Sequence, residues 1–256
     1  MRYFIELQYD GGAYCGWQRQ PEQPTVQGTI EDALTKLLRQ PTEIVGAGRT
    51  DTGVNASFYV AHFDSEEAVD CNHLTYKLNA MLAQDIAIKR IYQVADDLHA
   101  RFDAIEREYT YFLSPVKSPF RRHSAWICYY TLDIEKMNEA AGHLLGEHDF
   151  SCFEKVGGNN ATSICTVTEA VWKTYRPMHA DMMGFPCEEG DYIVFRIRAN
   201  RFLRNMVRAV VGSLIEVGRG KKDPSWITEL IASGNRSDAG SSVPGNALFF
   251  SGAEYK

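Results

Sequence analysis

The sequence predicts an α+β fold with two similar subdomains, each built on a mixed, mainly antiparallel sheet flanked by helices. Strand-like and helix-like segments are mixed along the 256 residues, without the strict alternation that a doubly wound sheet requires. Each half has an opening strand and one long amphipathic helix. Hydrophobic residues make up 45% and charged residues 23% of the chain, which is typical of a globular protein. We therefore expect one subdomain over residues 1–105 and another over 106–256.

The first half contains three segments with the alternating or aromatic-rich pattern of strands, over residues 2–9, 58–63 and 86–94. The turn residues Asp10, Gly11 and Gly12 end the first of them. A helix is predicted over 26–39, because apolar residues recur there at helical spacing and Thr25 is suited to the N-cap position.

The second half is expected to contain strands over residues 108–113, 165–175 and 192–199. In the first of these, Tyr109, Tyr111 and Leu113 share one face. Helices are predicted over residues 133–145, 202–217 and 224–233. Asp133 and Asp223 are the expected caps of the first and last helix, while Gly146 and Gly234 follow their ends.

The charge of the chain is unevenly distributed. The net charge is −6, yet residues 196–222 contain eight basic residues and one acidic residue, Glu216, which gives this segment +7. Remote charge is screened beyond a Debye length of about 8–10 Å, so a basic patch on an acidic body can bind phosphate. This segment predicts a nucleic-acid contact, although a solvated basic face has the same composition.

Several classes of protein are disfavoured by what the sequence lacks. The N-terminus has no apolar signal segment and no apolar run is long enough for a membrane helix, so we expect a cytoplasmic protein without a membrane span. No two of the six cysteines form a C-x-x-C pair, which argues against a zinc knuckle or a redox site. His143, His148 and Asp149 are conceivable metal ligands, but a structural or solvated role fits them better, and we expect no metal and no cofactor.

The stretch Gly46–Gly53, GAGRTDTG, is the most informative one. It matches neither the P-loop pattern nor the dinucleotide-binding pattern, and a strand follows it where a helix would be needed. Its glycines allow close approach of a ligand, and they flank Arg49 and Asp51. A carboxylate beside a guanidinium stays ionised at neutral pH and can act as nucleophile or base. A polar turn with a local ion pair remains the plainer interpretation.

Six motifs, in order and at matching spacing, carry a resemblance that covers nearly the whole chain. They are Tyr9–Gln18 (YDGGAYCGWQ), Gly48–Val54 (GRTDTGV), Arg101–Ala104 (RFDA), Arg107–Tyr111 (REYTY), His148–Phe153 (HDFSCF) and Asn200–Arg208 (NRFLRNMVR). In these motifs the chain resembles the TruA family of tRNA pseudouridine synthases. It departs from the family pattern at Asn55, where histidine is usual, at Arg201, and near the C-terminus.

The resemblance implies a function, a site and a partner. The family isomerises uridine to pseudouridine in the anticodon stem-loop of tRNA, at about positions 38 to 40, as a homodimer and without metal or cofactor. It has its active-site cleft between the two subdomains. Asp51 matches the nucleophile or ribose-directed base, Tyr109 matches the tyrosine that stacks on uracil, and Arg208 matches the basic residue paired with the aspartate. Arg49 is a further candidate for orienting the ribose or a flipped nucleotide.

The basic segment has an expected geometry as well. Arg201, Arg204 and Arg208 are spaced three and four residues apart at the start of the helix predicted over 202–217, so they are expected to share one face. We expect Arg201 and Arg204 to bind the tRNA backbone from that face.

Two other functions stay open. A catalytically silent tRNA-binding paralogue is compatible with the departures from the family pattern. An aspartate-dependent glycoside hydrolase would need two carboxylates at a defined separation, and only Asp51 lies in a distinctive loop.

Overall fold

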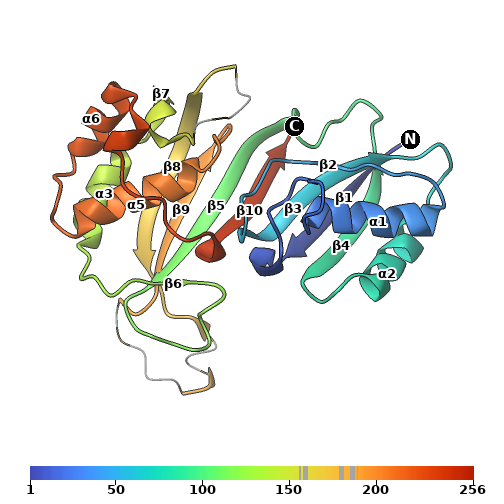
Figure 1. The fold of residues 1–256 in the computed structure, drawn as a ribbon, viewed down its shortest axis with the longest axis horizontal. Helices are drawn as coiled ribbons and strands as arrows, with labels where there is room; N and C mark the ends of the chain where they lie inside the picture. The colour runs from blue at the N-terminus through green and yellow to red at the C-terminus, as the bar shows by residue number, and fades with distance from the viewer. Residues whose placement is uncertain (156, 158–160, 179–181, 185–187, 189) are drawn as a thin grey trace. The chain divides into compact units, whose positions relative to one another are not determined.

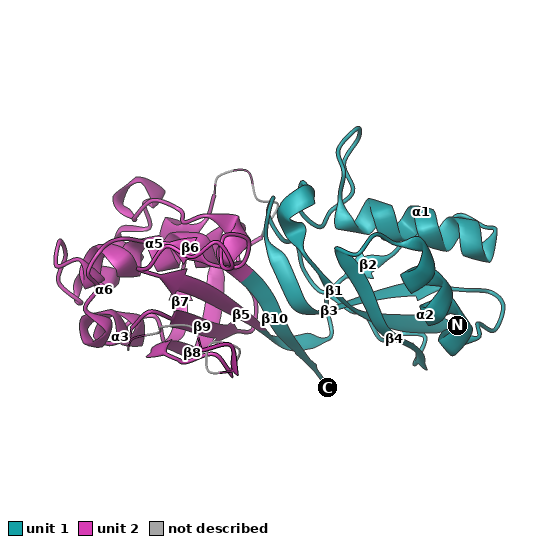
Figure 2. Ribbon diagram, turned by 90° about the horizontal axis from the view of Figure 1, so that it is seen from below, with its two compact units in different colours: residues 1–107, 249–256 teal, residues 108–248 magenta. Residues whose placement is uncertain are grey.

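The computed structural model describes residues 1–155, 157, 161–178, 182–184, 188 and 190–256. The chain divides into two compact units, which are coloured separately in Figure 2. Unit 1 comprises residues 1–107 and 249–256, and unit 2 comprises residues 108–248. Among the described residues no helix is long and apolar enough to cross a membrane.

Unit 1 contains a sheet in the order β4-β1-β3-β10, with the short strand β2 paired to β3. These strands span Arg2–Tyr9 (β1), Val45–Gly46 (β2), Asn55–Asp64 (β3), Ile86–Val94 (β4) and Leu248–Tyr255 (β10). β1 pairs antiparallel with both β3 and β4, whereas β10 joins β3 in parallel through Phe249 and Phe250. The helices of this unit are α1 (Val26–Leu38) and α2 (Cys71–Met81), and α2 packs against β4 (Figure 1).

The central strand β1 is buried on both faces. Tyr3, Leu7 and Tyr9 point to one face, where Tyr3 stacks on Phe63 at 5.3 Å between ring centroids. Phe4 points to the other face, into a cluster with Val60 and Ala100. The sheet is therefore fixed from both sides, which gives the loops at its ends a rigid base.

Unit 2 contains a sheet in the order β5-β9-β8-β7, with β6 paired in parallel to β5. The strands span Ala104–Ser114 (β5), Trp126–Ile127 (β6), Gly146–Asp149 (β7), Ile164–Thr174 (β8) and Ile193–Ala199 (β9). β8 pairs antiparallel with β7 and with β9. The helices include α3 (Ile134–Gly142), α5 (Met206–Gly218) and α6 (Trp226–Ser233), and α3 packs on both β8 and α5.

Most expected elements are confirmed, and with them the α+β class and the mainly antiparallel pairing. Thr25 caps α1 by accepting from the Gly28 amide at 3.2 Å. Asp133 caps α3 in the same way by accepting from the Lys136 amide at 3.0 Å. The alternation in β5 also holds, since Tyr109, Tyr111 and Leu113 are all buried.

Three helix boundaries were wrong. The helix predicted over 202–217 begins only at Met206, because Asn205 adopts a left-handed conformation with φ of 64°. The helix predicted to end at Leu145 ends at Gly142, and Gly146 instead opens β7. Asp223 lies outside α6, whose N-cap is Ser225.

The course of the C-terminus was not foreseen. Residues 249–256 return to unit 1, where β10 pairs with β3. Tyr255 also donates to the Ala100 carbonyl at 2.7 Å. The division of the sequence at residue 105 stays a prediction about domains. The two compact units differ from that division at residues 249–256, because β10 pairs in parallel with β3, which is far away in the sequence.

Candidate active site

Asp51 lies in a loop of unit 1 between β2 and β3, formed by residues 46–54 and called here the aspartate loop. Asp51 is half-buried, and its neighbours Arg49 and Thr52 are exposed. The two arms that lead to and from this tip are buried at Ala47 and Val54. The loop therefore presents Asp51 from a base that is itself part of the core.

The leading arm is fixed by β3. The Ala47 amide donates to the Val60 carbonyl at 2.8 Å, and the Tyr59 hydroxyl donates to the Gly48 carbonyl. A Cβ on Gly46 would collide with the Tyr59 hydroxyl and the Trp17 ring. A glycine is thus required where this arm passes two large aromatic side chains.

The residues on either side of Asp51 are fixed by the N-terminal motif. The Thr50 and Tyr9 hydroxyls share a buried hydrogen bond of 2.9 Å, and the Trp17 amide donates to the Thr50 carbonyl at 3.2 Å. A Cβ on Gly11 would overlap the Val54 carbonyl, while one on Gly16 would overlap that of Thr50. The Tyr9–Gln18 motif therefore supports the Gly48–Val54 motif, so the two motifs form one structural unit.

Asn55 belongs to the same support. It is 3% exposed, and its side-chain oxygen accepts from the Gly11 amide at 2.8 Å. The departure from the family pattern at this position thus lies beneath the aspartate loop rather than at its tip.

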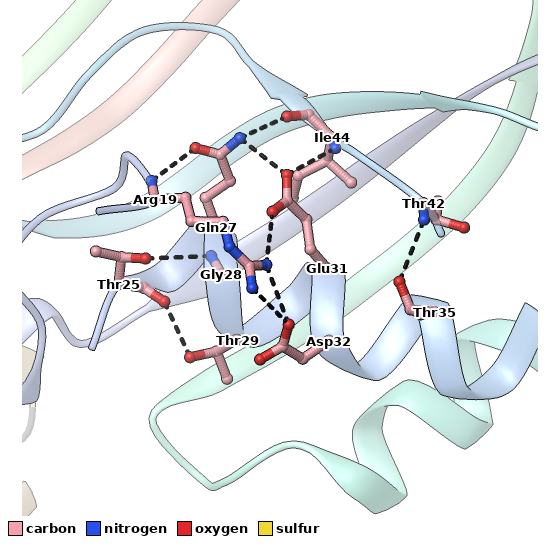
Figure 3. A network of polar contacts seen from close by, with 10 residues as sticks. All are labelled: Arg19, Thr25, Gln27, Gly28, Thr29, Glu31, Asp32, Thr35, Thr42 and Ile44. Atoms are coloured by element: carbon pink, nitrogen blue, oxygen red, sulfur yellow. Dashed lines mark hydrogen bonds and ion pairs between the residues drawn. The ribbon is translucent and has the colours of Figure 1, made fainter. Parts of the chain in front are cut away.

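A polar network anchors the chain that enters the loop (Figure 3). The buried Glu31 carboxylate of α1 accepts from Arg19 at 3.0 Å, from Gln27 at 2.9 Å and from the Ile44 amide at 3.1 Å. Gln27 also donates to the Ile44 carbonyl at 2.9 Å. Because Ile44 directly precedes β2, the network connects α1 to the start of the aspartate loop.

Arg107 is a residue to which the sequence analysis gave no role. Its guanidinium donates to the Ala104 carbonyl at 2.7 Å, to the Ala47 carbonyl at 3.3 Å and to the Arg101 carbonyl. It thereby joins the aspartate loop to the Arg101–Ala104 motif within unit 1. Its place in the REYTY motif was a signal, but only the fold reveals which carbonyls it contacts.

Tyr109 and Arg208 lie in unit 2. Tyr109 is 7% exposed, and its ring meets that of Phe202 edge-on at 5.0 Å. Arg208, on the first turn of α5, donates through Nε to the Val243 carbonyl at 2.7 Å. Burial raises the pKa of Tyr111, and the positive charge of Arg208 opposes that rise. A guanidinium and two tyrosines are thus held by the core of unit 2.

The expected single face for the three arginines was wrong. Arg201 and Arg204 precede α5, because helical hydrogen bonding begins only after the left-handed Asn205. Arg204 is exposed, whereas Arg201 is half-buried. The contact of Arg201 and Arg204 with RNA stays a prediction, but a shared helical face no longer supports it.

The charge of the +7 segment is partly balanced inside unit 2. Arg198 lies 2.7 Å from Glu108, and Arg196 lies 2.8 Å from Glu169. Ion pairs also join Glu216 to Arg219 and Lys221. At least four of the eight basic residues therefore have carboxylate partners, which lowers the net field that this segment presents to RNA.

The two histidines that the sequence offers as conceivable metal ligands make other contacts. His148 lies on β7, with Nε2 at 2.9 Å from the Leu145 carbonyl, and His143 contacts the Thr228 hydroxyl at 3.2 Å. Asp149 accepts from the Ser151 amide at 2.9 Å. Among the described residues, no group of three or more His, Cys, Asp or Glu side chains is arranged to hold a metal ion.

The sequence is similar to known proteins over nearly its whole length. The family model described as tRNA pseudouridine synthase matches residues 7–103 and 140–256. A curated protein of Bacteroides thetaiotaomicron named tRNA pseudouridine synthase A is 47% identical over 254 residues, covering 99% of this chain and 90% of that protein. Proteins of the same name from Bacteroides fragilis and Colwellia psychrerythraea are 46% and 39% identical, covering 99% and 100% of this chain and 96% and 94% of their own lengths. The resemblance seen in the six motifs is thus confirmed, and the chain belongs to the tRNA pseudouridine synthase family of isomerases.

Proposed function

We propose that this enzyme isomerises uridine to pseudouridine in the anticodon stem-loop of tRNA, at about positions 38 to 40. The observation that carries the proposal is the aspartate loop, which holds one carboxylate at a tip whose two arms are fixed by buried contacts. Family membership supports the reaction, and the target positions rest on the resemblance in the six motifs.

The chemistry is an isomerisation with no net oxidation. The bond from N1 of uracil to C1′ of the ribose breaks, the base turns, and C5 bonds to C1′. The proton leaves C5, and N1 ends with a proton, so atoms and charge balance. The Asp51 carboxylate serves as the nucleophile or as the base directed at the ribose. The target uridine must leave its stack first, which costs a few kcal/mol.

Tyr109 and Arg208 are the other proposed catalytic residues. Tyr109 supplies an aromatic face for uracil and a hydroxyl for proton transfer. Arg208 supplies a fixed positive charge that favours an ionised carboxylate and stabilises negative charge as the base moves. Arg49, Arg201 and Arg204 are proposed to bind the RNA, since guanidiniums suit phosphate recognition.

The remaining parts of the proposal concern partners. The enzyme acts on tRNA in the cytoplasm, works as a homodimer, and needs neither metal nor organic cofactor, because the isomerisation requires no redox step and no external energy source.

The test uses an unmodified tRNA transcript labelled with tritium at C5 of its uridines. Pseudouridine formation releases the label to water, so the wild-type enzyme should release tritium in proportion to the uridines it converts. Mapping of the modified positions should place them near 38 to 40. Tight binding of the transcript without tritium release would instead identify a silent tRNA-binding protein.

A further inference from the structure

Residues 115–132 of unit 2 form a basic, aromatic-rich segment whose function has not been assigned so far. It contains Lys117, Arg121 and Arg122, and no Asp or Glu occurs between Tyr109 and Leu132. In a chain with a net charge of −6, a stretch of this length without a carboxylate is set apart from its surroundings. Unlike the +7 segment, which contains Glu216, this segment contains no carboxylate that could offset its positive charge.

The base of this segment includes β6, which pairs with β5 (Figure 1). Arg121 donates to the Asp191 carbonyl at 2.6 Å and to the Ser114 hydroxyl, and its guanidinium lies 3.7 Å from the centre of the Tyr192 ring. The Cys128 amide donates to the Ser114 carbonyl at 2.8 Å. Arg121 is therefore an anchor, and the outer side chains project from a fixed base.

Three outer side chains face solvent. Phe120 is 73% exposed, and Lys117 and Arg122 are exposed on either side of it in the sequence. Among the residues that the structure describes, neither Lys117 nor Arg122 has a carboxylate within ion-pair distance. An exposed aromatic ring with cations close by in the sequence is a combination that proteins use to stack an unpaired base and to bind the adjoining phosphates.

The segment adjoins the residues that hold Arg208. Asn246 donates to the Arg122 carbonyl at 3.1 Å. Two residues earlier, the Pro244 carbonyl accepts from the Tyr111 hydroxyl at 3.2 Å, and the neighbouring Val243 carbonyl accepts from Arg208. Residues 243–246 thus connect the proposed catalytic arginine to the outer loop within one unit.

From this arrangement we propose that Lys117, Phe120 and Arg122 bind the RNA strand that flanks the target uridine. One unstacked base packs on Phe120, and the phosphates next to it bind Lys117 and Arg122. This inference rests on the proposed function of Arg208, because that role places substrate beside residues 243–246.

The charge distinguishes this partner from a protein surface. An apolar docking site for a second copy of the chain would have to accept two cations from each partner, and like charges at an interface are costly. A nucleic acid supplies the opposite charge along its whole backbone.

The experiment measures the affinity of each variant for an unmodified tRNA transcript over a range of salt concentrations. Phe120→Ala and Phe120→Leu should weaken binding by about 5- to 150-fold, while Phe120→Trp should retain it, since stacking needs an aromatic face. Lys117→Gln with Arg122→Gln should lower the slope of log K against log salt by about 0.7–0.9 for each phosphate that is no longer neutralised. Tyr76→Ala and Lys36→Gln with Lys89→Gln change exposed residues of unit 1 and should bind as the wild type does.

Circular dichroism checks that each variant is folded, and sedimentation gives its oligomeric mass. Unchanged affinity and salt slope in the Phe120 and Lys117/Arg122 variants would overturn the proposal. Unchanged affinity with an altered mass would overturn it as well and would assign the segment to contact between copies. Tritium release by the wild-type enzyme is measured separately, so failure of the proposed function is seen independently of these binding results.

Discussion

The aspartate loop of unit 1 and the +7 segment of unit 2 are held in place by different kinds of contact. Around Asp51 the main chain itself is fixed. The Tyr59 hydroxyl and the Trp17 amide donate to the Gly48 and Thr50 carbonyls, and the Gly53 amide donates to the Tyr14 carbonyl. In unit 2 the buried helix α5 fixes Arg208, whereas Arg204 is exposed outside that helix. Main-chain support fixes an atom in space, and an exposed cation supplies charge without fixed geometry. We therefore expect the aspartate loop of unit 1 to set the reaction geometry. We expect the outer arginines, Arg201 and Arg204, to contribute affinity for RNA.

Among variants that leave the three proposed catalytic side chains in place, the largest effect on the rate is expected at the support of the aspartate loop. Gly11→Ala should slow single-turnover pseudouridine formation by about 10²-fold, because its Cβ would overlap the Val54 carbonyl and displace the loop by a fraction of an ångström or more. Gly12→Ala is the matched control, since its Cβ would meet only the Asp10 side chain at 3.0 Å. Equal rates for the two variants would show that the position of the loop does not limit the reaction.

Tyr109 tests whether unit 2 also contributes to the rate. We expect Tyr109→Phe to lower the maximal rate by about 10²-fold or more with little change in affinity, as the loss of general acid–base assistance would. Rate constants at saturating tRNA and binding constants measured in parallel separate the two quantities. Full activity in this variant would restrict Tyr109 to stacking.

The outer arginines should affect binding. Arg201→Gln with Arg204→Gln should weaken tRNA binding and reduce the slope of log K against log salt by about 1.4–1.8 if both contact phosphate. Arg208→Gln should instead lower the rate at saturating tRNA. Wild-type affinity and slope in the double variant would mean that Arg201 and Arg204 form only a solvated surface.

A separate effect concerns stability at low pH rather than the reaction, and it originates in unit 1. Burial lowers the pKa of His62 to about 4, and its Nδ1 accepts from the Ala100 amide at 3.1 Å. Between pH 6.5 and about 4 the unfolded chain therefore binds a proton that the native state does not, and stability falls as pH falls. The full loss is about 3 kcal/mol. His99, Arg2 and Asp64 also act on this imidazole.

His62→Asn, which keeps an acceptor near the Nδ1 position, should reduce this acid sensitivity. Urea unfolding at pH 7 and pH 4.5 measures it, and His73→Asn at an exposed position is the control. An unchanged pH dependence in His62→Asn would assign the acid sensitivity to other groups.

Much of the fold could be predicted, because alternation and capping are local signals. β1, β4 and α1 follow from their own residues. α2 was not predicted, since only Leu74 and Leu78 of its residues are buried and its apolar stripe is narrow. β10 was missed because its parallel pairing with β3 depends on a partner far away in sequence.

The candidate site shows the same limit. Asp51 was found from its loop motif, and Tyr109 and Arg208 from the resemblance. The support of Asp51 by Gly11, Gly16 and Arg107 could not be derived, because these residues meet the loop only after folding. The left-handed Asn205 also escaped prediction, since the apolar pattern of α5 continues to either side of it.

The most direct test of the role of Asp51 is Asp51→Asn in the tritium-release assay, with tRNA affinity measured on the same preparation. The amide keeps the shape of the side chain but is a poor nucleophile and a poor base. We predict that turnover is abolished while tRNA binding stays close to that of the wild type. Activity within about tenfold of the wild type, which is less than the usual contribution of one acid–base group, would contradict the role of Asp51.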